Sequence, residues 1–245
     1  MTTDDDTAHI GITCPETHPV FAPVGDRLRA RGHTVSYFDP NRRVPRENLR
    51  SLSLFVNKRT RPASVQSLVD AERLGVPTWN SATGVLACVS RFSQLCVLAG
   101  VGFPVPDASG RKPSGDYVAK RLYHWEMDPQ LNGEGDLYEE FLDAEPVDYK
   151  YYVVHDGEAY RTVVLRTTSK LYGEKRVLGE TDPVPEQVDR IRSLMAELGM
   201  RGVGVDLLRV DGEWYAVDLN PCPSFAETGL EGALVDSIES SLASG

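Results

Sequence analysis

Three side chains that can ligate a metal ion, Asp206, Asp218 and Asn220, lie close together in the last third of the sequence. Two adjacent segments with strand-like patterns carry them: VGVDLLRV (203–210) and WYAVDLN (214–220). Carboxylate and amide oxygens are hard ligands that favour magnesium, which usually keeps some waters and shares its coordination with phosphates. These residue types therefore predict chemistry on ATP through magnesium.

The turn between the two segments decides whether these side chains meet. The residues Asp211-Gly212-Glu213 are a strong hairpin signal. With a three-residue loop, Val210 faces Trp214, and the register runs on so that Asp206 faces Asp218. A two-residue turn would shift the register by one residue and separate the two aspartates.

Side chains alternate along a strand, so the polar residues are expected to share one face of this hairpin. Asp206, Asp218 and Asn220 then lie with the small residues Gly204 and Ala216. The opposite face is expected to enter the core with these apolar residues: Val203, Val205, Leu207, Val217 and Leu219. Two unneutralised carboxylates that face each other are destabilising, so a cation is expected between them. The alternative is a solvated outer face whose charges carry no function.

At these residues the chain resembles the ATP-grasp superfamily. In that superfamily an acidic residue on one strand and a carboxylate-x-Asn pattern on the next hold the magnesium ions of ATP, which matches Asp206 and Asp218-Leu219-Asn220. The ligase branches more often have Glu at the first position of the pattern, and Asp218 is one methylene shorter. The resemblance implies ATP and two magnesium ions as cofactors, with manganese as a substitute.

Phosphate and ribose contacts are expected at three positions from the same resemblance. Lys120 ends the run YVAK (117–120) and resembles the lysine that contacts the ATP phosphates, although a lysine at a strand end is ordinarily just solvated. An earlier phosphate-binding lysine is usual in the superfamily, and Arg91 stands at the corresponding place. Arginine also binds phosphate, with a different reach. Asp148 matches the acidic position that binds the ribose hydroxyls.

The adenine contact is expected in LYEEFL (137–142), which resembles the hinge segment of these proteins. The side chain of Glu139 is expected to accept from the exocyclic amine. The backbone of Glu140, Phe141 and Leu142 is expected to pair with the ring edge. The alternative for this stretch is a buried strand with a charged entrance. The glycine-rich loop that covers the phosphates in related enzymes is short here, with its glycines in NGEGD (132–136).

Candidate catalytic residues lie between the hinge and the metal strands. Related enzymes place an arginine there, which stabilises negative charge on the transferred phosphoryl group or the tetrahedral intermediate. Arg166 is the candidate, because a guanidinium keeps its charge and donates two parallel hydrogen bonds. Lys170, Lys175 and Arg176 lie in the following loop, which could close over the substrate. Exposed basic residues in loops are ordinarily only soluble surface.

The N-terminal third has the alternating pattern of an α/β fold. Strands are expected at residues 9–13, 33–38 and 52–56, and helices at 20–31 and 63–74. Such alternation predicts a parallel sheet covered by helices, in which ligands bind at the C-terminal ends of the strands. Thr13–His18 and Asn57–Arg61 are therefore candidate contacts for the second substrate. No GxGxxG follows the first strand, which argues against a nicotinamide cofactor.

The resemblance implies an ATP-grasp fold of class α/β (α+β) in three parts. They are an N-terminal Rossmann-like subdomain with a parallel sheet (1–82), a small central lid subdomain (83–137) and a C-terminal subdomain with an antiparallel sheet and the magnesium site (138–245). A single apolar helix is expected from Thr83 to Ala99. A later helix, from Asp182 to Leu198, has an apolar stripe that belongs to the core.

The composition of the 245-residue chain is ordinary for a globular protein, with 41% hydrophobic and 25% charged residues. The net charge of −10 argues against a nucleic-acid or anionic-membrane surface. No apolar run approaches the roughly twenty residues that span a bilayer, and the N-terminus lacks a secretion signal, so a cytoplasmic location is expected. The four cysteines show no paired metal spacing.

The function that the resemblance implies is an ATP-dependent carboxylate–amine ligase acting on small molecules. One substrate's carboxylate would be activated as an acyl phosphate, and the amine of the other would attack it. The pattern is similar to glutamate ligases that modify ribosomal protein and to glutathione synthetases. A kinase of the inositol-trisphosphate type shares the fold and is the first alternative, because segments 149–154 and 218–225 resemble it at least as well. A non-catalytic nucleotide sensor is the second.

Overall fold

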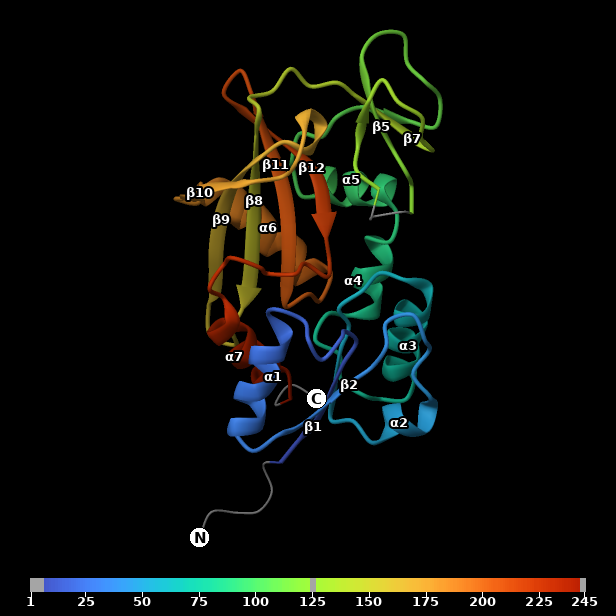
Figure 1. Cartoon of the computed structure of the whole chain (residues 1–245), viewed down its shortest axis with the longest axis vertical. Coiled ribbons are helices and arrows are strands. Elements are labelled where there is room, and N and C mark those ends of the chain that lie inside the picture. The colour runs from blue at the N-terminus through green and yellow to red at the C-terminus, as the bar shows by residue number, and fades with distance from the viewer. Residues whose placement is uncertain (1–6, 124–126, 243–245) are drawn as a thin grey trace.

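The computed structural model of this chain describes residues 7–123 and 127–242 and contains three β-sheets (Figure 1). The N-terminal sheet has three parallel strands in the order β2-β1-β3. The strands of this sheet and the helices between and after them are, in chain order, β1 (His9–Ile12), α1 (Phe21–Ala30), β2 (Thr34–Tyr37), α2 (Arg46–Arg50), β3 (Leu54–Val56) and α3 (Pro62–Arg73). Strands β1 and β3 are largely buried because helices cover the sheet, as in other parallel sheets. The α/β alternation expected from the sequence is confirmed.

A four-stranded antiparallel sheet in the order β4-β7-β5-β6 forms the upper right of Figure 1. Its strands are β4 (Ala108–Ser109), β5 (Tyr117–Lys120), β6 (Gln130–Leu131) and β7 (Leu137–Glu140). Val118 pairs with Glu139, and Lys120 pairs with Leu137. Because side chains alternate, Lys120 and Glu139 lie on the same face of this sheet.

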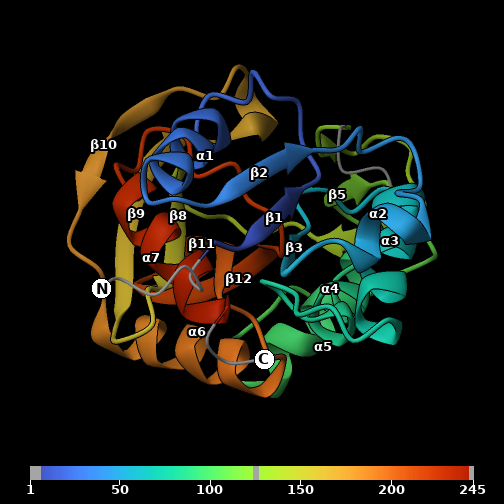
Figure 2. The same cartoon turned by 90° about the horizontal axis from the view of Figure 1, so that it is seen from below.

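The third sheet has five antiparallel strands in the order β10-β9-β8-β11-β12. Its strands are β8 (Val147–His155), β9 (Tyr160–Thr168), β10 (Val177–Thr181), β11 (Gly202–Val210) and β12 (Glu213–Asn220). Helix α6 (Pro185–Glu197) covers one face, as the view from below shows (Figure 2). The predicted apolar stripe of α6 is confirmed as core, since Val188, Ile191, Leu194 and Met195 are buried against strands β8, β9, β11 and β12.

The last helix, α7 (Glu231–Leu242), joins the C-terminal sheet to the N-terminal one. It packs beside α1 (Figure 1), and Trp79 donates from Nε1 to Ser237 Oγ on α7 at 2.9 Å. Both sheets contribute to one apolar cluster, which includes Ile10 of β1 and Val154 of β8. Across residues 7–123 and 127–242, every helix is too short or too polar to span a lipid bilayer.

The apolar stretch 83–99 forms two helices, so the expectation of one continuous helix was wrong. Helix α4 spans Ala82–Ala87 and helix α5 spans Arg91–Gly100. Ser90 is the reason for the break, because its Oγ accepts a hydrogen bond from Ser93 N and caps a new helix. The cap places Arg91 in the first turn of α5.

Replacing Ser90 by Ala should lower the free energy of unfolding by about 1 kcal/mol, because the first turn of α5 loses its N-terminal cap. Chemical denaturation of the two proteins measures this. Ser193→Ala provides a matched control, because Ser193 is exposed within α6 and should change the stability by less than about 0.5 kcal/mol. Equal stability of the two variants would contradict the capping role.

Candidate active site

The hairpin that carries the candidate metal ligands has a two-residue turn. Val210 pairs with Glu213, and the loop residues Asp211 and Gly212 have φ angles of 49° and 91°. Positive φ at both loop residues is the type I′ geometry that Asp-Gly favours in hairpins. The expectation of a three-residue loop was therefore wrong.

A β-bulge restores the register that the shorter turn would have lost. Leu207 pairs with Ala216, but the next pair is Asp206 with Asp218, which makes Val217 the extra residue. One inserted residue compensates for a shift of one residue. Asp206 and Asp218 therefore face each other as expected.

The bulge also changes which side chains of β12 enter the core. Ala216 is fully buried in the apolar cluster beneath α6, whereas Val217 lines a cavity on the other face together with Asp218. The placement of Ala216 on the polar face and Val217 in the core was wrong. The reason is that a bulge interrupts the two-residue alternation of the strand.

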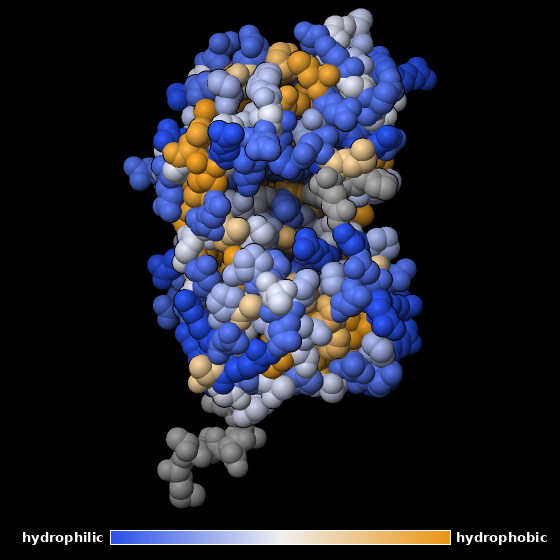
Figure 3. Space-filling model, in the orientation of Figure 1, coloured by the Kyte–Doolittle hydropathy of each residue, from blue (hydrophilic) through white to orange (hydrophobic). Residues whose placement is uncertain are grey.

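A cavity of about 350 Å³ lies between the four-stranded and five-stranded sheets. Figure 3 shows a hollow across this face of the molecule. All three candidate metal ligands line the cavity. So do these predicted nucleotide contacts: Arg91, Lys120, Glu139, Glu140, Leu142 and Asp148. The side chain of Phe141, whose predicted contact is through its backbone, is half-buried.

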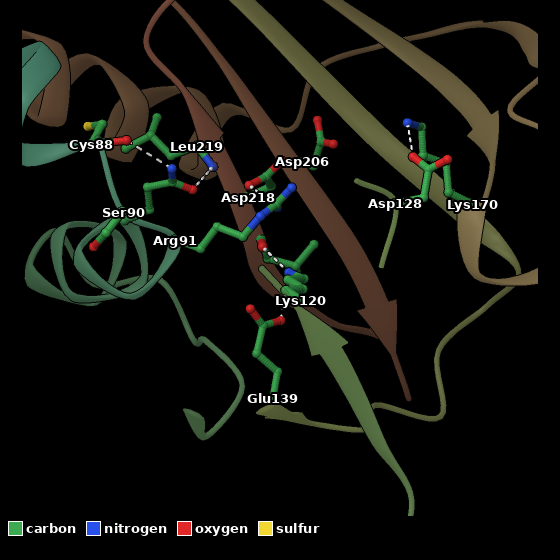
Figure 4. Close-up of polar contacts among 12 residues, drawn as sticks. Cys88, Ser90, Arg91, Lys120, Asp128, Glu139, Lys170, Asp206, Asp218 and Leu219 are labelled. Atoms are coloured by element: carbon green, nitrogen blue, oxygen red, sulfur yellow. Dashed lines mark hydrogen bonds and ion pairs between the residues drawn. The ribbon is translucent and has the colours of Figure 1, made fainter. Parts of the chain in front are cut away.

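Each of the two facing aspartates has a cationic partner from another element. Lys150 of β8 forms an ion pair with Asp206. Arg91 reaches from α5 and donates from Nη1 to Asp218 Oδ1 at 3.1 Å (Figure 4). Burial acts to lower the pKa of Lys150, but Asp206 more than offsets this and raises it. Side chains of the protein thus neutralise the two carboxylates.

Helix α5 is fixed to β12 by a buried amide as well as by Arg91. Gln94 Oε1 accepts from Leu219 N at 3.2 Å, and its Nε2 donates to Cys88 O at 3.0 Å (Figure 4). Leu219 lies between Asp218 and Asn220. The helix therefore holds the backbone of the strand at the candidate metal ligands.

The donor set of the hairpin fits magnesium. Asp206, Asp218 and Asn220 offer two carboxylates and one amide oxygen, and Asn220 Oδ1 is oriented by a hydrogen bond from Cys222 N at 2.9 Å. Within the described part of the chain, no group of three or more His, Cys, Asp or Glu could hold a metal ion. Phosphate oxygens and waters would have to complete the coordination, as is usual for magnesium at nucleotide sites.

A buried ion pair within the four-stranded sheet lines the cavity, and its lysine also binds the five-stranded sheet. Lys120 lies 2.7 Å from Glu139 Oε2 and donates to Val217 O, at the bulge, at 2.9 Å (Figure 4). Burial raises the pKa of Glu139, and Lys120 counteracts the increase. Among the described residues, the buried Glu139 Oε1 has no hydrogen-bond partner. This acceptor in the cavity wall fits a donor such as the adenine amine.

Strand β8 lines the cavity with three alternate side chains, Asp148, Lys150 and Tyr152. Only Asp148 was anticipated from the sequence. The period-two alternation of a strand would have identified the other two once Asp148 was placed. Lys150 matters most, because it is the cation that pairs with Asp206.

The predicted catalytic residues divide between two faces of the five-stranded sheet. Arg166 pairs with Tyr149, whose ring packs on Trp214 on the face opposite Asp148, so Arg166 is exposed away from the cavity. Lys170 lines the cavity and forms an ion pair with Asp128.

Of the two other basic residues predicted in the loop after β9, Lys175 lines the cavity and Arg176 does not. Arg176 is exposed, and its backbone N donates to Thr168 Oγ1 at 2.8 Å. Lys175 lines the cavity instead. Burial, followed by the charge of Lys150, lowers the pKa of Lys175. The structure therefore brings Lys170 and Lys175 to the other candidate residues, and not Arg166 or Arg176.

Replacing Asp148 by Asn should remove a pH dependence from nucleotide binding. Burial raises the pKa of Asp148 from 3.8 to about 6, and Lys150 lowers it only in part. If the carboxylate accepts the ribose hydroxyls, ADP affinity should fall as the pH drops through about 6. Asp148→Asn should bind ADP about tenfold more weakly at neutral pH, as expected for the loss of a charged hydrogen bond. Calorimetric titration across this pH range measures both effects.

The control for this experiment is Asp143→Asn, which changes an exposed aspartate after β7 and should behave as the wild type does. An identical pH profile in the two variants would contradict the role of Asp148. Stability should show the opposite sign. Because the folded-state pKa is raised, the native state binds more protons between pH 3.8 and about 6, and this group lowers the stability as the pH rises through that range.

The cavity brings five cations together with the candidate metal ligands. They are Arg91, Lys120, Lys150, Lys170 and Lys175. Cations and carboxylates at one site suit a polyphosphate that carries a divalent ion, because fixed charges neutralise phosphate oxygens where water is largely excluded.

Comparison with known proteins gives similarity in structure only. No protein-family model matches the sequence, and no curated protein sequence matches it significantly. The ATP-grasp ligase PsnB, complexed with a minimal precursor, Mg and ADP, superposes with a TM-score of 0.69 at 19% identity over 97% of this chain and 99% of PsnB.

Two further solved structures are similar over most of this chain. An L-amino acid ligase from Bacillus licheniformis gives a TM-score of 0.71 at 15% identity over 94% of this chain and 70% of its own. A RimK domain ATP-grasp protein from Sphaerobacter thermophilus gives 0.68 at 15% identity over 96% and 98%. Together with the arrangement of sheets, these similarities confirm the predicted architecture: this chain has the ATP-grasp fold.

Proposed function

We propose that this protein is an ATP- and magnesium-dependent ligase that activates a carboxylate as an acyl phosphate and joins it to an amine. The observation that carries the proposal is the single cavity that collects Asp206, Asp218 and Asn220, five cations and the buried acceptor Glu139 Oε1. These groups match, in turn, the metal ions, the phosphates and the adenine of ATP. Ligases are prominent among the proteins of similar fold, which supports this reaction class.

The nucleotide would lie between the two sheets. Glu139 Oε1 would accept from the adenine amine, the backbone of residues 140–142 would pair with the ring edge, and Asp148 would accept from the ribose hydroxyls. Lys120 and Arg91 would contact the phosphates. Asp206, Asp218 and Asn220 would hold magnesium, which supplies charge neutralisation on the phosphate oxygens when bound.

The reaction needs no covalent intermediate on the protein. An oxygen of the substrate carboxylate attacks the γ-phosphorus of ATP, the bond from that phosphorus to the bridging oxygen breaks, and ADP leaves. The amine nitrogen then attacks the acyl carbon, the bond to the phosphate oxygen breaks, and the nitrogen loses a proton. The products are an amide, ADP and phosphate.

The cationic side chains at the cavity have roles that follow from this balance. The transferred phosphoryl group carries negative charge from ATP to the acyl phosphate and is then released as free phosphate. Lys150 lies beside Asp206, and Lys170 and Lys175 lie on the loop that borders the cavity. We assign these three to stabilising the charge on the transferred phosphoryl group, because fixed positive charges at that point lower the barrier.

The proposal must also specify whether the substrates are peptides or small molecules. PsnB is complexed with a precursor peptide, and the Bacillus protein is described as an L-amino acid ligase. Our proposal is small carboxylate and amine substrates, bound near the C-terminal ends of the N-terminal strands. Arg59, an exposed cation directly after Lys58, is suited to a substrate carboxylate there.

Trapping with hydroxylamine tests the reaction class. The protein is incubated with ATP, magnesium, hydroxylamine and pools of amino acids, hydroxy acids or peptides. An acyl phosphate reacts to give a hydroxamate, so hydroxamate formed together with ADP is the expected result. ADP released without hydroxamate, and dependent on a polyol phosphate, would identify a kinase. Nucleotide binding without any turnover would identify a sensor, and both of these outcomes overturn the ligase proposal.

A further inference from the structure

Lys58 is a charged side chain enclosed by aromatic rings outside the cavity. It is 2% exposed. Its Nζ lies 4.3 Å from the ring centroid of Phe21, 5.2 Å from that of Phe225 and 5.7 Å from that of Trp79. It donates to Pro223 O at 2.5 Å, and among the described residues no carboxylate forms an ion pair with it. Burying an ammonium is costly, and cation–π contacts with one hydrogen bond offset that cost only in part.

The carbonyl that Lys58 holds belongs to the loop that follows Asn220. In this loop Cys222 N donates to Asn220 Oδ1 at 2.9 Å, and Cys222 Sγ donates to Asn57 O at 3.5 Å. Thr13, at the end of β1, donates to Asn57 Oδ1 at 3.1 Å and accepts from Lys58 N at 2.9 Å. Contacts therefore run without interruption from the N-terminal sheet to the side chain of the candidate metal ligand.

The same loop forms part of the cavity wall. Pro223 and Ser224 line the cavity, and the carbonyl of Pro223 is the acceptor for Lys58. Asn80 holds the other end of the loop, because its Nδ2 donates to Pro221 O at 2.8 Å. Asn80 fixes the start of the loop. The hydrogen bond from the Lys58 ammonium to the Pro223 carbonyl therefore sets how the rest of the loop lies beside Asn220.

We propose that Lys58 is a positioning residue of the candidate metal site: from the N-terminal sheet, its ammonium holds the Pro223 carbonyl and thereby orients Asn220 and the adjoining cavity wall. This inference rests on the proposed function, since it concerns the same magnesium site. Lys58 is enclosed by Phe21, Trp79 and Phe225, so it acts through the loop and does not touch the nucleotide.

The first test compares Lys58→Met with the matched control Lys112→Met, which removes an exposed lysine that pairs with Glu134. Calorimetry measures the ADP dissociation constant with magnesium and with a chelator. The ratio of the chelator value to the magnesium value is the metal-dependent gain in ADP affinity. We expect Lys58→Met to reduce this ratio about tenfold, the size of effect found for side chains that orient metal ligands. ADP affinity in the chelator should stay unchanged in both variants.

The outcomes separate this inference from the proposed function. If the wild type binds ADP no more tightly with magnesium than without it, the proposed function fails. If the wild type shows the gain and Lys58→Met shows the same gain, only the positioning role is overturned.

A second measurement needs no variant and remains informative if Lys58→Met does not fold. Burial lowers the pKa of Lys58 to about 8. Of the groups that face it besides Arg59, Cys14 and Cys222 have pKa values raised by burial to about 11, and His18 has a pKa lowered by burial to about 4. Lys58 is therefore the member of this cluster that titrates near pH 8.

The metal-dependent gain in ADP affinity should decline several-fold as the pH of the wild type rises through about 8. The stability should move the other way, because the native state binds fewer protons than the unfolded state between about 8 and 10.5, so this group adds stability as the pH rises there. If Lys58 only stabilised the fold, the metal-dependent gain would not decline while the stability rises with pH. A flat gain in the wild type overturns the proposal.

Discussion

Replacing Asp206 by Asn is expected to abolish most of the magnesium-dependent affinity for ADP and to lower turnover about 10²- to 10³-fold, as for other groups that stabilise charge in transition states. The substitution keeps the shape of the side chain and one oxygen but removes the negative charge that faces Asp218 across the hairpin. Calorimetry with and without magnesium measures the loss of binding, and ADP release measures turnover.

Asp211→Asn supplies the matched control on the same hairpin. Asp211 is exposed in the turn with a φ of 49°, a conformation that Asn adopts readily, so the hairpin should be retained. This variant should bind magnesium and ADP as the wild type does. Wild-type magnesium dependence in Asp206→Asn would remove the central support for the metal site.

Asp206→Asn also removes the partner of Lys150. Lys150 is 10% exposed, and the variant removes its ion pair with Asp206. Some loss of thermal stability is therefore expected, so binding should be compared well below the unfolding temperature. Near-ultraviolet circular dichroism at that temperature distinguishes a lost ligand from a lost fold.

Lys150→Met should produce the second large effect, with a different signature. Turnover should fall about 10²-fold, because a fixed positive charge beside the transferred phosphoryl group is removed. The magnesium concentration that half-saturates ADP binding should not rise, since Asp206 loses the ammonium that competes with a metal ion for its carboxylate. Titrating turnover and ADP binding with magnesium separates the two effects.

Lys112→Met is the control for removing a lysine, and Lys150→Arg is the control for charge. Lys112 is 43% exposed and should be replaceable without loss of turnover. Lys150→Arg keeps the positive charge beside Asp206 and should retain more turnover than Lys150→Met. If Lys150→Met lowers magnesium affinity and leaves turnover at saturating magnesium intact, Lys150 orients Asp206 and does not act on the phosphoryl group.

Local patterns in the sequence were sufficient for much of the fold. The strand–helix alternation of the first third predicted the parallel sheet, because apolar period and turn residues are read within a few positions of each other. The apolar stripe of α6 was predicted for the same reason. The break at Ser90 was missed because the apolar run continues on both sides of the cap, and one serine is a weak signal within it.

Some residues of the candidate site were predicted from patterns within one hairpin, and others from the resemblance to ATP-grasp proteins. Asp206, Asp218 and Asn220 follow from alternation along two adjacent strands, and Asp148 from the resemblance of its segment to ATP-grasp proteins. Lys150 was missed although it shares the face of Asp148, since a lysine in a strand has no distinctive spacing. The cavity is lined by segments that are far apart in the sequence, and no local pattern predicts that they lie close together.

The sequence by itself determined the α/β class, the hairpin that carries the candidate metal ligands and the resemblance to ATP-grasp proteins. All three follow from patterns among residues that are close together in the chain. Tertiary structure decided the rest. The bulge at Val217 restores the pairing of Asp206 with Asp218, and a bulge is set by packing: Ala216 enters the core beneath α6 while Lys120, from another sheet, binds the Val217 carbonyl. Cationic partners from β8 and α5 then neutralise the two aspartates, because only the folded chain pairs β8 with β11 and packs α5 against β12.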